Sequence, residues 1–459
     1  MNMNLKSLLV PAAVALAAIP VTPLRAQTVL FKSDTARHVI YRIPALVAYG
    51  NTLLYFGDDR SGVTDATAWG DVGSEGNISI VARRSDNCGD TWYPEVQTVV
   101  EGKGSRGFDR AHGDAAVVCD RKSGKLLLLC ASGEISYGRS DVRVARTPRD
   151  GGGYDYRLDL TKAQHAGRYY STDGGQTWTG EDISGQIYAL YDEASADTYA
   201  EGKGNVAVER LFFASGRICQ SRQIKRGSHY RIYSVLTTNQ GSLVVYSDDF
   251  GQRWKPLGGA SARPAPQGDE AKIEELPDGR VLLSCRMMGG RCFNIFTYSN
   301  KSCTEGTWAT PVASTSLSGG TASQRNATNG EIMIVPAKSA AGKKVFVALQ
   351  SVPYGNNWSS TINVDRRSHV SIYWKVLASA ADYATPEQFL TGWTRYEVTT
   401  ARSAYSTMAI DGRGRLAFAY EDNGASKVIG SQPADVYDLT FISLPLEKIT
   451  GGQYTYRKR

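Results

Sequence analysis

The feature that most constrains the fold of this chain is an eight-residue box that recurs along it. The clearest copy is Ser171-Thr172-Asp173-Gly174-Gly175-Gln176-Thr177-Trp178. Residues 85–92 repeat it with Asn87 in place of the key Asp, and residues 247–254 repeat it with Arg253 in place of Thr. The copies start at 85, 171 and 247, so successive starts are 86 and 76 residues apart. A motif that returns at long, similar intervals indicates an array of equivalent structural units.

Each Ser-x-Asp-x-Gly-x-Thr-Trp box has the chemistry of a tight turn. Asp bonds nearby backbone, Gly permits a positive φ, and the Trp is expected to pack beneath the turn. A β-like run precedes the boxes, as in residues 78–82 and 241–246, and a degenerate fourth copy lies at Ser299 to Trp308. The spacing suits one four-stranded propeller blade with its loops. We therefore expect the boxes to be structural and to contact no substrate.

The composition agrees with an all-β chain. The sequence has 459 residues, including 47 Gly and 25 Tyr, and shows many short runs of Val, Leu, Ile and Tyr broken by Gly, Asp and Asn. Such a pattern is typical of many short strands. This length suits either two domains or one large all-β wheel.

Residues 1–26 are typical of a secretory signal peptide. Lys6 gives a positive start, residues 8–19 are apolar, and Arg25-Ala26 precede Gln27. We expect cleavage near Ala26 and an exported protein, periplasmic or secreted, without a membrane span. The net charge of +7 is spread along the chain with no basic arm, so we expect no nucleic-acid partner. A modest positive field favours anionic substrates.

Seven cysteines is an odd number, and their spacings match no metal motif. We expect most of them to be free, buried thiols. Cys285 and Cys292 flank a predicted hairpin tip and are the pair best placed to form a bridge.

One arginine stands out from the short apolar runs. Arg42 lies in Tyr41-Arg42-Ile43-Pro44-Ala45-Leu46, directly before Ile-Pro. Together with the boxes, this segment resembles the sialidase (neuraminidase) family of bacterial type, over almost the whole chain after residue 26. That family binds the carboxylate of sialic acid with three arginines, because Arg suits planar, bidentate recognition. The resemblance implies Arg42, Arg286 and Arg367 for these roles, with Arg366 as the competitor of Arg367.

The resemblance also implies an unusual nucleophile. A carboxylate nucleophile would be repelled by the carboxylate of the substrate, and sialidases use Tyr instead. Tyr405, in Ser403-Ala404-Tyr405-Ser406-Thr407-Met408, matches the tyrosine segment of the family. A neutral Tyr needs an adjacent base, and Glu270 matches that glutamate. Glu274 and Glu275 are near competitors, but the spacing to Arg286 favours Glu270.

The remaining roles follow from the same resemblance. The family has an Asp that acts as general acid and base, a few residues after another Arg. The resemblance implies Asp65 for the acid, with Asp71 as its rival, and Arg60 as a further substrate-binding residue. The segment after Asp65 is longer than is usual in the family. Glu421 sits where the family has a Glu that orients the first arginine. Asp114 sits where many members contact polar groups of the sugar.

The sequence therefore predicts a signal peptide at 1–26 and a six-bladed β-propeller of four-stranded antiparallel sheets at 27–459. The predicted activity is that of an exo-α-sialidase, which cleaves terminal sialic acids from glycoproteins, glycolipids and oligosaccharides with retention, without metal or other cofactor. Two alternatives stay open: a trans-sialidase of the same fold, giving a transfer or anhydro product, and a non-catalytic propeller that only binds sialoglycans. Linkage preference and oligomeric state are left open.

Overall fold

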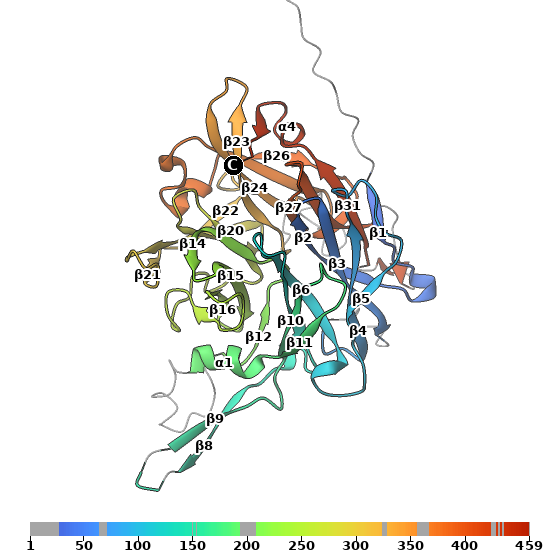
Figure 1. Cartoon of the computed structure of the whole chain (residues 1–459), viewed down its shortest axis with the longest axis vertical. Coiled ribbons are helices and arrows are strands. Elements are labelled where there is room, and N and C mark those ends of the chain that lie inside the picture. The colour runs from blue at the N-terminus through green and yellow to red at the C-terminus, as the bar shows by residue number, and fades with distance from the viewer. Residues whose placement is uncertain are drawn as a thin grey trace, which may run out of the picture.

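A computed structural model of the chain forms a six-bladed β-propeller, as the sequence predicts. The structure describes residues 27–63, 71–148, 150–152, 154–192, 208–323, 328–355, 367–423, 428–429, 432–433 and 436–458. The predicted signal peptide at 1–26 lies outside these residues. The sheets follow one another around a common centre, so that colour runs from blue through green and orange to red around Figure 1.

The first three blades come from the N-terminal half of the chain. Blade 1 contains β2 (Tyr41–Tyr49), β3 (Thr52–Val63), β4 (Gly76–Ser85) and β5 (Gln97–Val100). Blade 2 contains β6 (His112–Cys119), β7 (Leu126–Ser132), β10 (His165–Ser171) and β11 (Thr179–Asp182). Blade 3 contains β12 (Leu211–Phe213), β14 (Cys219–Arg226), β15 (His229–Thr238), β16 (Gly241–Ser247) and β17 (Lys255–Pro256).

The other three blades complete the circle. Blade 4 contains β18 (Ala271–Glu275), β19 (Val281–Met287), β20 (Gly290–Tyr298), β21 (Gly306–Trp308) and β22 (Val312–Thr315). Blade 5 contains β23 (Ile332–Ser339), β24 (Lys344–Pro353), β25 (Val370–Leu377), β26 (Thr394–Glu397) and β32 (Tyr454–Tyr456). Blade 6 contains β27 (Arg402–Ile410), β28 (Leu416–Asn423), β31 (Asp438–Leu444) and the N-terminal β1 (Thr28–Phe31).

Four of the six sheets have a fifth strand, which the four-stranded prediction did not include. In blade 2 the extra strand is β13 (Gly216–Arg217), which pairs with β6 in parallel. This pairing interrupts the inner edge of blade 3 between β12 and β14 and carries Arg217 toward the propeller centre. Strand β32 adds to blade 5 in the antiparallel direction, next to β23. These extra strands come from segments outside the four-strand repeat, so the spacing of the boxes does not predict them.

Short elements decorate the blades. The helices are α1 (Ser184–Asp192) and α4 (Leu446–Ile449), and among the described residues no helix is both long and apolar enough to cross a membrane. Single 3-10 turns lie at η1 (Thr35–Arg37), η2 (Phe108–Arg110), η3 (Tyr137–Arg139), η5 (Ala380–Tyr383) and η6 (Pro386–Phe389). Two ribbons stand apart from the blades: β8 (Arg143–Pro148) with β9 (Tyr154–Asp159), which projects in Figure 1, and β29 (Val428–Ile429) with β30 (Gln432–Pro433).

The boxes form turns between the third and fourth strands of blades 1, 2 and 3. In the clearest copy, Ser171 Oγ accepts from Gly175 N at 2.9 Å, and the Asp173 carboxylate accepts from Thr177 N at 3.0 Å. Asn87 and Asp249 accept the equivalent bond in the other two copies. The degenerate copy behaves alike, because Asn300 accepts from Thr304 N between β20 and β21. These box side chains bond to the backbone of their own turns.

Strand β1 closes the propeller by pairing with β31, which joins the N-terminal strand to the last blade. Phe441 on β31 is 2% exposed, and its ring lies 5.0 Å from the ring of Trp92, the anchor of the first box. Apolar side chains of blades 6 and 1 meet here in one buried cluster. All seven cysteines are free thiols, including Cys285 and Cys292, which oppose each other on β19 and β20.

We expect Phe441→Ala to lower the free energy of unfolding by about 3–5 kcal/mol, because it leaves a cavity where the first and last blades meet. Urea unfolding measures the change. The control is Val29→Ala on the neighbouring strand β1, where Val29 is 48% exposed, and the expected loss is below about 1 kcal/mol. Equal losses in the two variants would contradict the packing described for the closure.

Candidate active site

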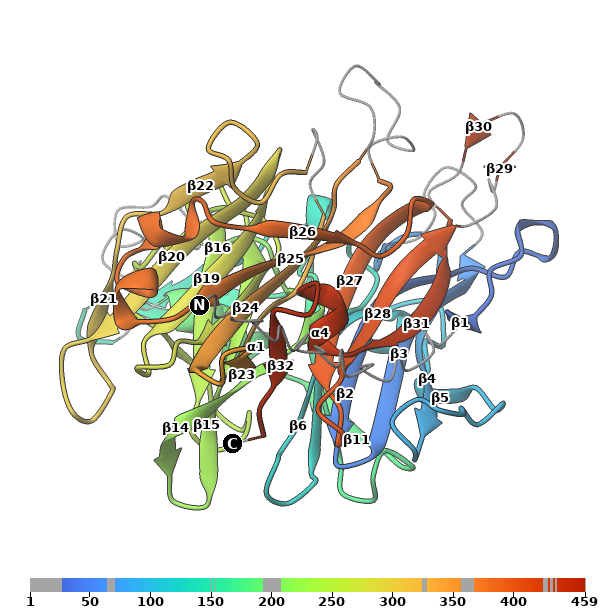
Figure 2. The ribbon, with the colours of Figure 1, turned by 90° about the horizontal axis from the view of Figure 1, so that it is seen from above.

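A pocket of about 490 Å³ opens at one end of the inner strands. Its walls come from all six blades, so strands far apart in sequence converge on it. The predicted site residues that line it are Arg42, Asp114, Glu270, Arg286, Arg367 and Tyr405. Figure 2 shows the propeller edge-on. In this view the β14–β15 turn and the chain end after β32 lie toward the same face of the propeller. A second hollow there is lined by β14 and β32 residues.

Backbone irregularities aim three of these side chains into the pocket. The pairing register shifts between Arg42 and Ala45 on β2, between Gly113 and Ala116 on β6, and between Ser403 and Ser406 on β27. Within two of these shifts, non-glycine residues adopt positive φ, 58° at Ile43 and 56° at Asp114. Bulges of this kind redirect side chains and recur beside active sites. The strained backbone at this end of the inner strands is thus a mark of a functional site.

Glu421, which is fully buried on β28, holds two of the bulges together. Its carboxylate accepts from Arg42 Nε at 2.6 Å and from the backbone N–H of Ile43 at 2.9 Å. Its other oxygen accepts from the backbone N–H of Tyr405 at 3.0 Å. One carboxylate therefore fixes the Arg42 guanidinium and the main chain that carries Tyr405. Such support restricts an otherwise mobile arginine to one geometry.

Tyr405, Glu270 and Arg286 form a hydrogen-bonded triad. The Tyr405 hydroxyl donates to Glu270 Oε2 at 2.7 Å and accepts from Arg286 Nη1 at 2.8 Å. Arg286 Nη1 also lies 2.6 Å from the same Glu270 oxygen. Burial raises the pKa of Tyr405 well above its ordinary value, so the hydroxyl is neutral, and burial also raises the pKa of Glu270 despite Arg286. The carboxylate is therefore a stronger base than an exposed glutamate, and it already accepts the hydrogen bond of the tyrosine hydroxyl.

Three guanidinium groups surround the Tyr405 ring. The Cζ atoms of Arg42, Arg367 and Arg286 lie 5.7, 5.9 and 6.0 Å from its centroid. They come from blades 1, 5 and 4, respectively. A cluster of three fixed cations above one aromatic ring forms a receptor for a carboxylate or another planar anion.

The carboxyl groups of blades 1 and 2 lie on the opposite wall of the pocket. Buried Asp58 accepts from Arg60 Nη2 at 2.8 Å and from Asp114 N at 3.1 Å. Burial and the neighbouring Asp58 raise the pKa of Asp114 well above its ordinary value. This environment favours the protonated form of Asp114, which can donate a hydrogen bond to a ligand.

Arg60 lies behind the pocket wall, because its side chain is 1% exposed and bonds Asp58 and Asp71. Direct contact between Arg60 and a ligand thus requires movement of the wall. Asp71 is 86% exposed at the pocket edge and bonds Arg60 at 3.1 Å. Partial enclosure raises the pKa of Asp71, but Arg60, Arg42 and Arg367 outweigh it and lower the pKa below the ordinary value. Asp65 lies outside the described residues.

The rivals of the predicted base lie elsewhere. Glu274 pairs with Arg217 and Arg222 deeper along the axis, and Glu275 accepts from Ser221 and Arg222. Arg366 lies outside the described residues. Among the residues of the pocket wall that the sequence analysis did not single out are Tyr137, Gln164, Phe212 and Asp269. Asp269 adjoins Glu270 in sequence and pairs with Arg286 at 3.4 Å, whereas the other three carry no local signal.

We expect Glu421→Gln to lower the free energy of unfolding by about 3–5 kcal/mol, because a buried guanidinium loses its countercharge. The control is Glu397→Gln, which breaks the partly exposed pair with Arg395 at 3.0 Å and should cost about 1 kcal/mol or less. Chemical denaturation compares the two. A loss for Glu421→Gln as small as that of the control would contradict the support assigned to this carboxylate.

Comparisons with known proteins find sialidases by sequence and by fold. No family model matches the sequence. A curated relative, the sialidase of Micromonospora viridifaciens, is 30% identical over 250 residues, which are 54% of this chain and 32% of that protein. The match thus spans about a third of the length of this relative.

Solved structures share the fold at low identity. The intramolecular trans-sialidase from Ruminococcus gnavus, in complex with oseltamivir carboxylate, matches with a TM-score of 0.61 and 15% identity, over 92% of this chain and 98% of that one. The Trypanosoma rangeli sialidase with 2,3-difluorosialic acid, a covalent intermediate, matches with a TM-score of 0.54 and 15% identity, over 93% and 60% of the two chains. This chain is thus similar in sequence to a bacterial sialidase over about half of its length, and it shares its propeller fold with solved sialidases and trans-sialidases.

Proposed function

We propose that this protein is an exo-α-sialidase that removes terminal sialic acids from glycoconjugates with retention of configuration. One observation carries the proposal: the Tyr405 hydroxyl donates to Glu270 at 2.7 Å, beneath three guanidinium groups within 6.0 Å of its ring. Sialic acid bears a carboxylate on its anomeric carbon. A site for it therefore needs fixed cations beside the nucleophile, which this pocket has.

Substrate binding in this proposal begins with the carboxylate. Arg42, Arg286 and Arg367 bind it, and Glu421 keeps Arg42 in position. The pocket of about 490 Å³ is in the range that holds a small ligand. Asp114, as a neutral acid, donates a hydrogen bond to a polar group of the sugar. The substrates are sialylated glycoproteins, glycolipids and oligosaccharides.

In the first chemical step the Tyr405 oxygen attacks the anomeric carbon while its proton passes to Glu270. The bond between that carbon and the glycosidic oxygen breaks, and Asp65 gives its proton to the leaving oxygen. Arg286 Nη1, 2.8 Å from the tyrosine oxygen, stabilises the negative charge that develops there. The product of the step is a sialyl-tyrosine.

In the second step a water molecule attacks the anomeric carbon and gives a proton to Asp65. The bond to Tyr405 breaks, Glu270 returns the proton to the tyrosine oxygen, and sialic acid leaves with retained configuration. The covalent intermediate of the Trypanosoma rangeli sialidase, which has the same fold, supports a covalent route. In the same proposal, residues 1–26 direct export and residues 27–459 form the catalytic domain, so the enzyme meets its glycans in the periplasm or outside the cell.

We expect Tyr405→Phe to lower kcat/KM on a fluorogenic sialoside by about a thousandfold or more, because the nucleophilic oxygen is lost while the ring remains. The matched control is Tyr437→Phe. Tyr437 is fully buried, and its ring lies 5.2 Å from Arg42 Cζ, but the proposed mechanism gives it no part in the reaction. The control should retain most of the activity.

Full activity in Tyr405→Phe would refute the nucleophile assignment. Product analysis on defined sialyllactose isomers then identifies the reaction itself. Free sialic acid is expected; an anhydro sugar or a new sialoside would instead show transfer. Absence of turnover with retained binding would favour a sialoglycan-binding protein.

The two candidate acids are separated by leaving-group chemistry. We expect Asp65→Ala to slow natural linkages far more than substrates with good leaving groups, because only a poor leaving group needs protonation. Asp71→Ala should slow both classes alike, because Asp71 bonds Arg60 and its lowered pKa keeps it ionised. Steady-state kinetics on sialyllactose and on an aryl sialoside measure both variants. The reverse pattern would assign the acid to Asp71.

A further inference from the structure

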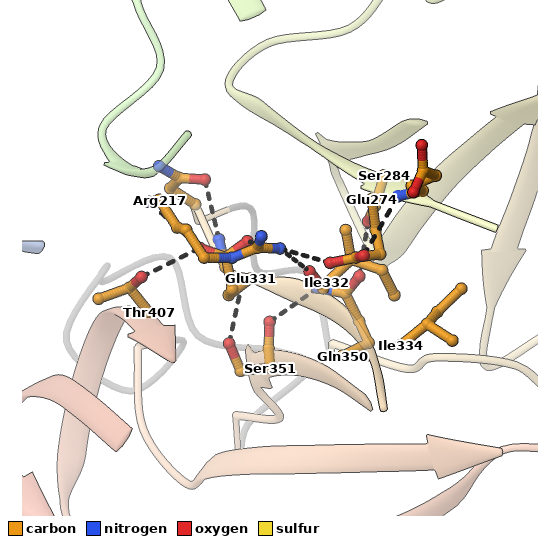
Figure 3. A network of polar contacts seen from close by, with 12 residues as sticks. Arg217, Glu274, Ser284, Glu331, Ile332, Ile334, Gln350, Ser351 and Thr407 are labelled. Carbon is orange, nitrogen blue, oxygen red and sulfur yellow. Dashed lines mark hydrogen bonds and ion pairs between the residues drawn. The ribbon is translucent and has the colours of Figure 1, made fainter. Parts of the chain in front are cut away.

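Lys272 lies on the same face of β18 as the predicted base. Side chains alternate along a strand, so Glu270, Lys272 and Glu274 share one face. Glu270 lines the pocket, and Glu274 pairs with Arg217 at 2.7 Å. Figure 3 shows Arg217 bonded to Glu274 and Glu331, with Thr407 also on Glu331. Lys272 thus stands between the active-site pocket and this network of ion pairs.

The Lys272 ammonium is enclosed without a hydrogen bond. The residue is 2% exposed, and among the described residues Nζ has no acceptor. Gly216, at φ 101°, makes room for it, because a Cβ there would lie 2.6 Å from Nζ. Burial lowers the pKa of Lys272 to about 8, although Glu331 and Glu270 oppose the shift. A buried, unbonded cation is unfavourable unless nearby carboxylates compensate it.

The carboxylates around Lys272 differ in how fully other cations and donors pair with them. Arg217 and Arg291 are its neighbouring cations, and Glu331 and Glu270 its neighbouring carboxylates. Glu331 already accepts from Arg217 and from Thr407 at 3.0 Å. Glu270 has Arg286 as its cationic partner, but Arg286 also pairs with Asp269 and bonds Tyr405. Arg286 therefore compensates the negative charge of Glu270 only in part, and the positive charge of Lys272 adds to this compensation.

We propose that Lys272 is a positioning residue that keeps Glu270 ionised and so ready to accept the Tyr405 proton. This inference rests on the proposed function, because it assigns Lys272 a part in activating the nucleophile. A positive charge favours the ionised form of a nearby carboxyl. Burial acts in the opposite direction on Glu270. Without Lys272, a larger fraction of Glu270 would be protonated in mildly acid solution and unable to act as a base.

The first test measures the ionisation of the Glu270 carboxyl group in the absence of substrate. Infrared spectroscopy follows the carboxyl band of Glu270 as pH changes, and Glu270→Gln identifies that band. We expect Lys272→Met to raise the midpoint by about one pH unit. Lys272→Gln, also uncharged, should do the same and serves if the Met variant does not fold. The matched control is Arg222→Met, which removes a cation from the far end of the network, where Arg222 pairs with Glu274 at 2.7 Å.

An unchanged midpoint in both Lys272 variants would overturn the inference, and so would an equal rise in Arg222→Met. The second test is the pH profile of kcat/KM on a sialoside. Its acidic limb should move to higher pH by the same amount in the Lys272 variants, with about tenfold less activity below the limb and little loss above it. Failure of the proposed function is read separately, as absence of turnover by the unmodified protein.

Discussion

The site depends on one buried carboxylate. Glu421 bonds the Arg42 side chain, the backbone of Ile43 and the backbone of Tyr405, which come from the first and last blades. Its bonds to Arg42 and Ile43 cross the junction at which the propeller closes, and its bond to the backbone of Tyr405 lies within blade 6. If this carboxylate were absent, the guanidinium would lose its countercharge and both bulges would lose a shared acceptor. One carboxylate thus fixes the position of the Arg42 guanidinium and the position of the main chain that carries Tyr405.

The propeller centre tolerates charges that a compact core would exclude. Six inner strands converge there, and alternate side chains of each must face the axis. Arg217 meets this constraint by pairing with Glu274 at 2.7 Å and Glu331 at 3.4 Å, and by donating to Ile332 O at 2.8 Å. Buried pairs add little net stability, because desolvation offsets their attraction. Their value here is alignment, since they bond blade 4 to the start of blade 5 at a fixed register.

The sequence was sufficient to predict features that depend on local hydrogen bonds or on resemblance to a family. It was not sufficient to predict features that depend on closure of the propeller. The boxes reported the blade turns because their hydrogen bonds run within eight residues. Arg42, Glu270, Arg286 and Tyr405 line one pocket, as expected from residues known to act together. Arg60 was predicted to contact substrate, yet it is buried behind Asp71, and nothing in its neighbours indicates that depth.

Lys272 and β13 illustrate the same limit. Alternation places Lys272 beside Glu270, but its enclosure depends on Gly216, more than fifty residues earlier in the chain. The chain leaves blade 3 for the two residues of β13, which pair in parallel with β6. No repeat in the sequence predicts this excursion.

Closure of the propeller also determines when the site exists. Arg42 and Glu421 are 379 residues apart in sequence, and Tyr405 and Glu270 are 135 residues apart. Contacts of such separation carry a large loop-closure entropy and form only with the rest of the fold. A chain in which blades 1 and 6 have not met therefore lacks the contact between Arg42 and Glu421. In the proposed function, the nucleophile is thus assembled only when the fold is complete, and a partly folded chain would present none.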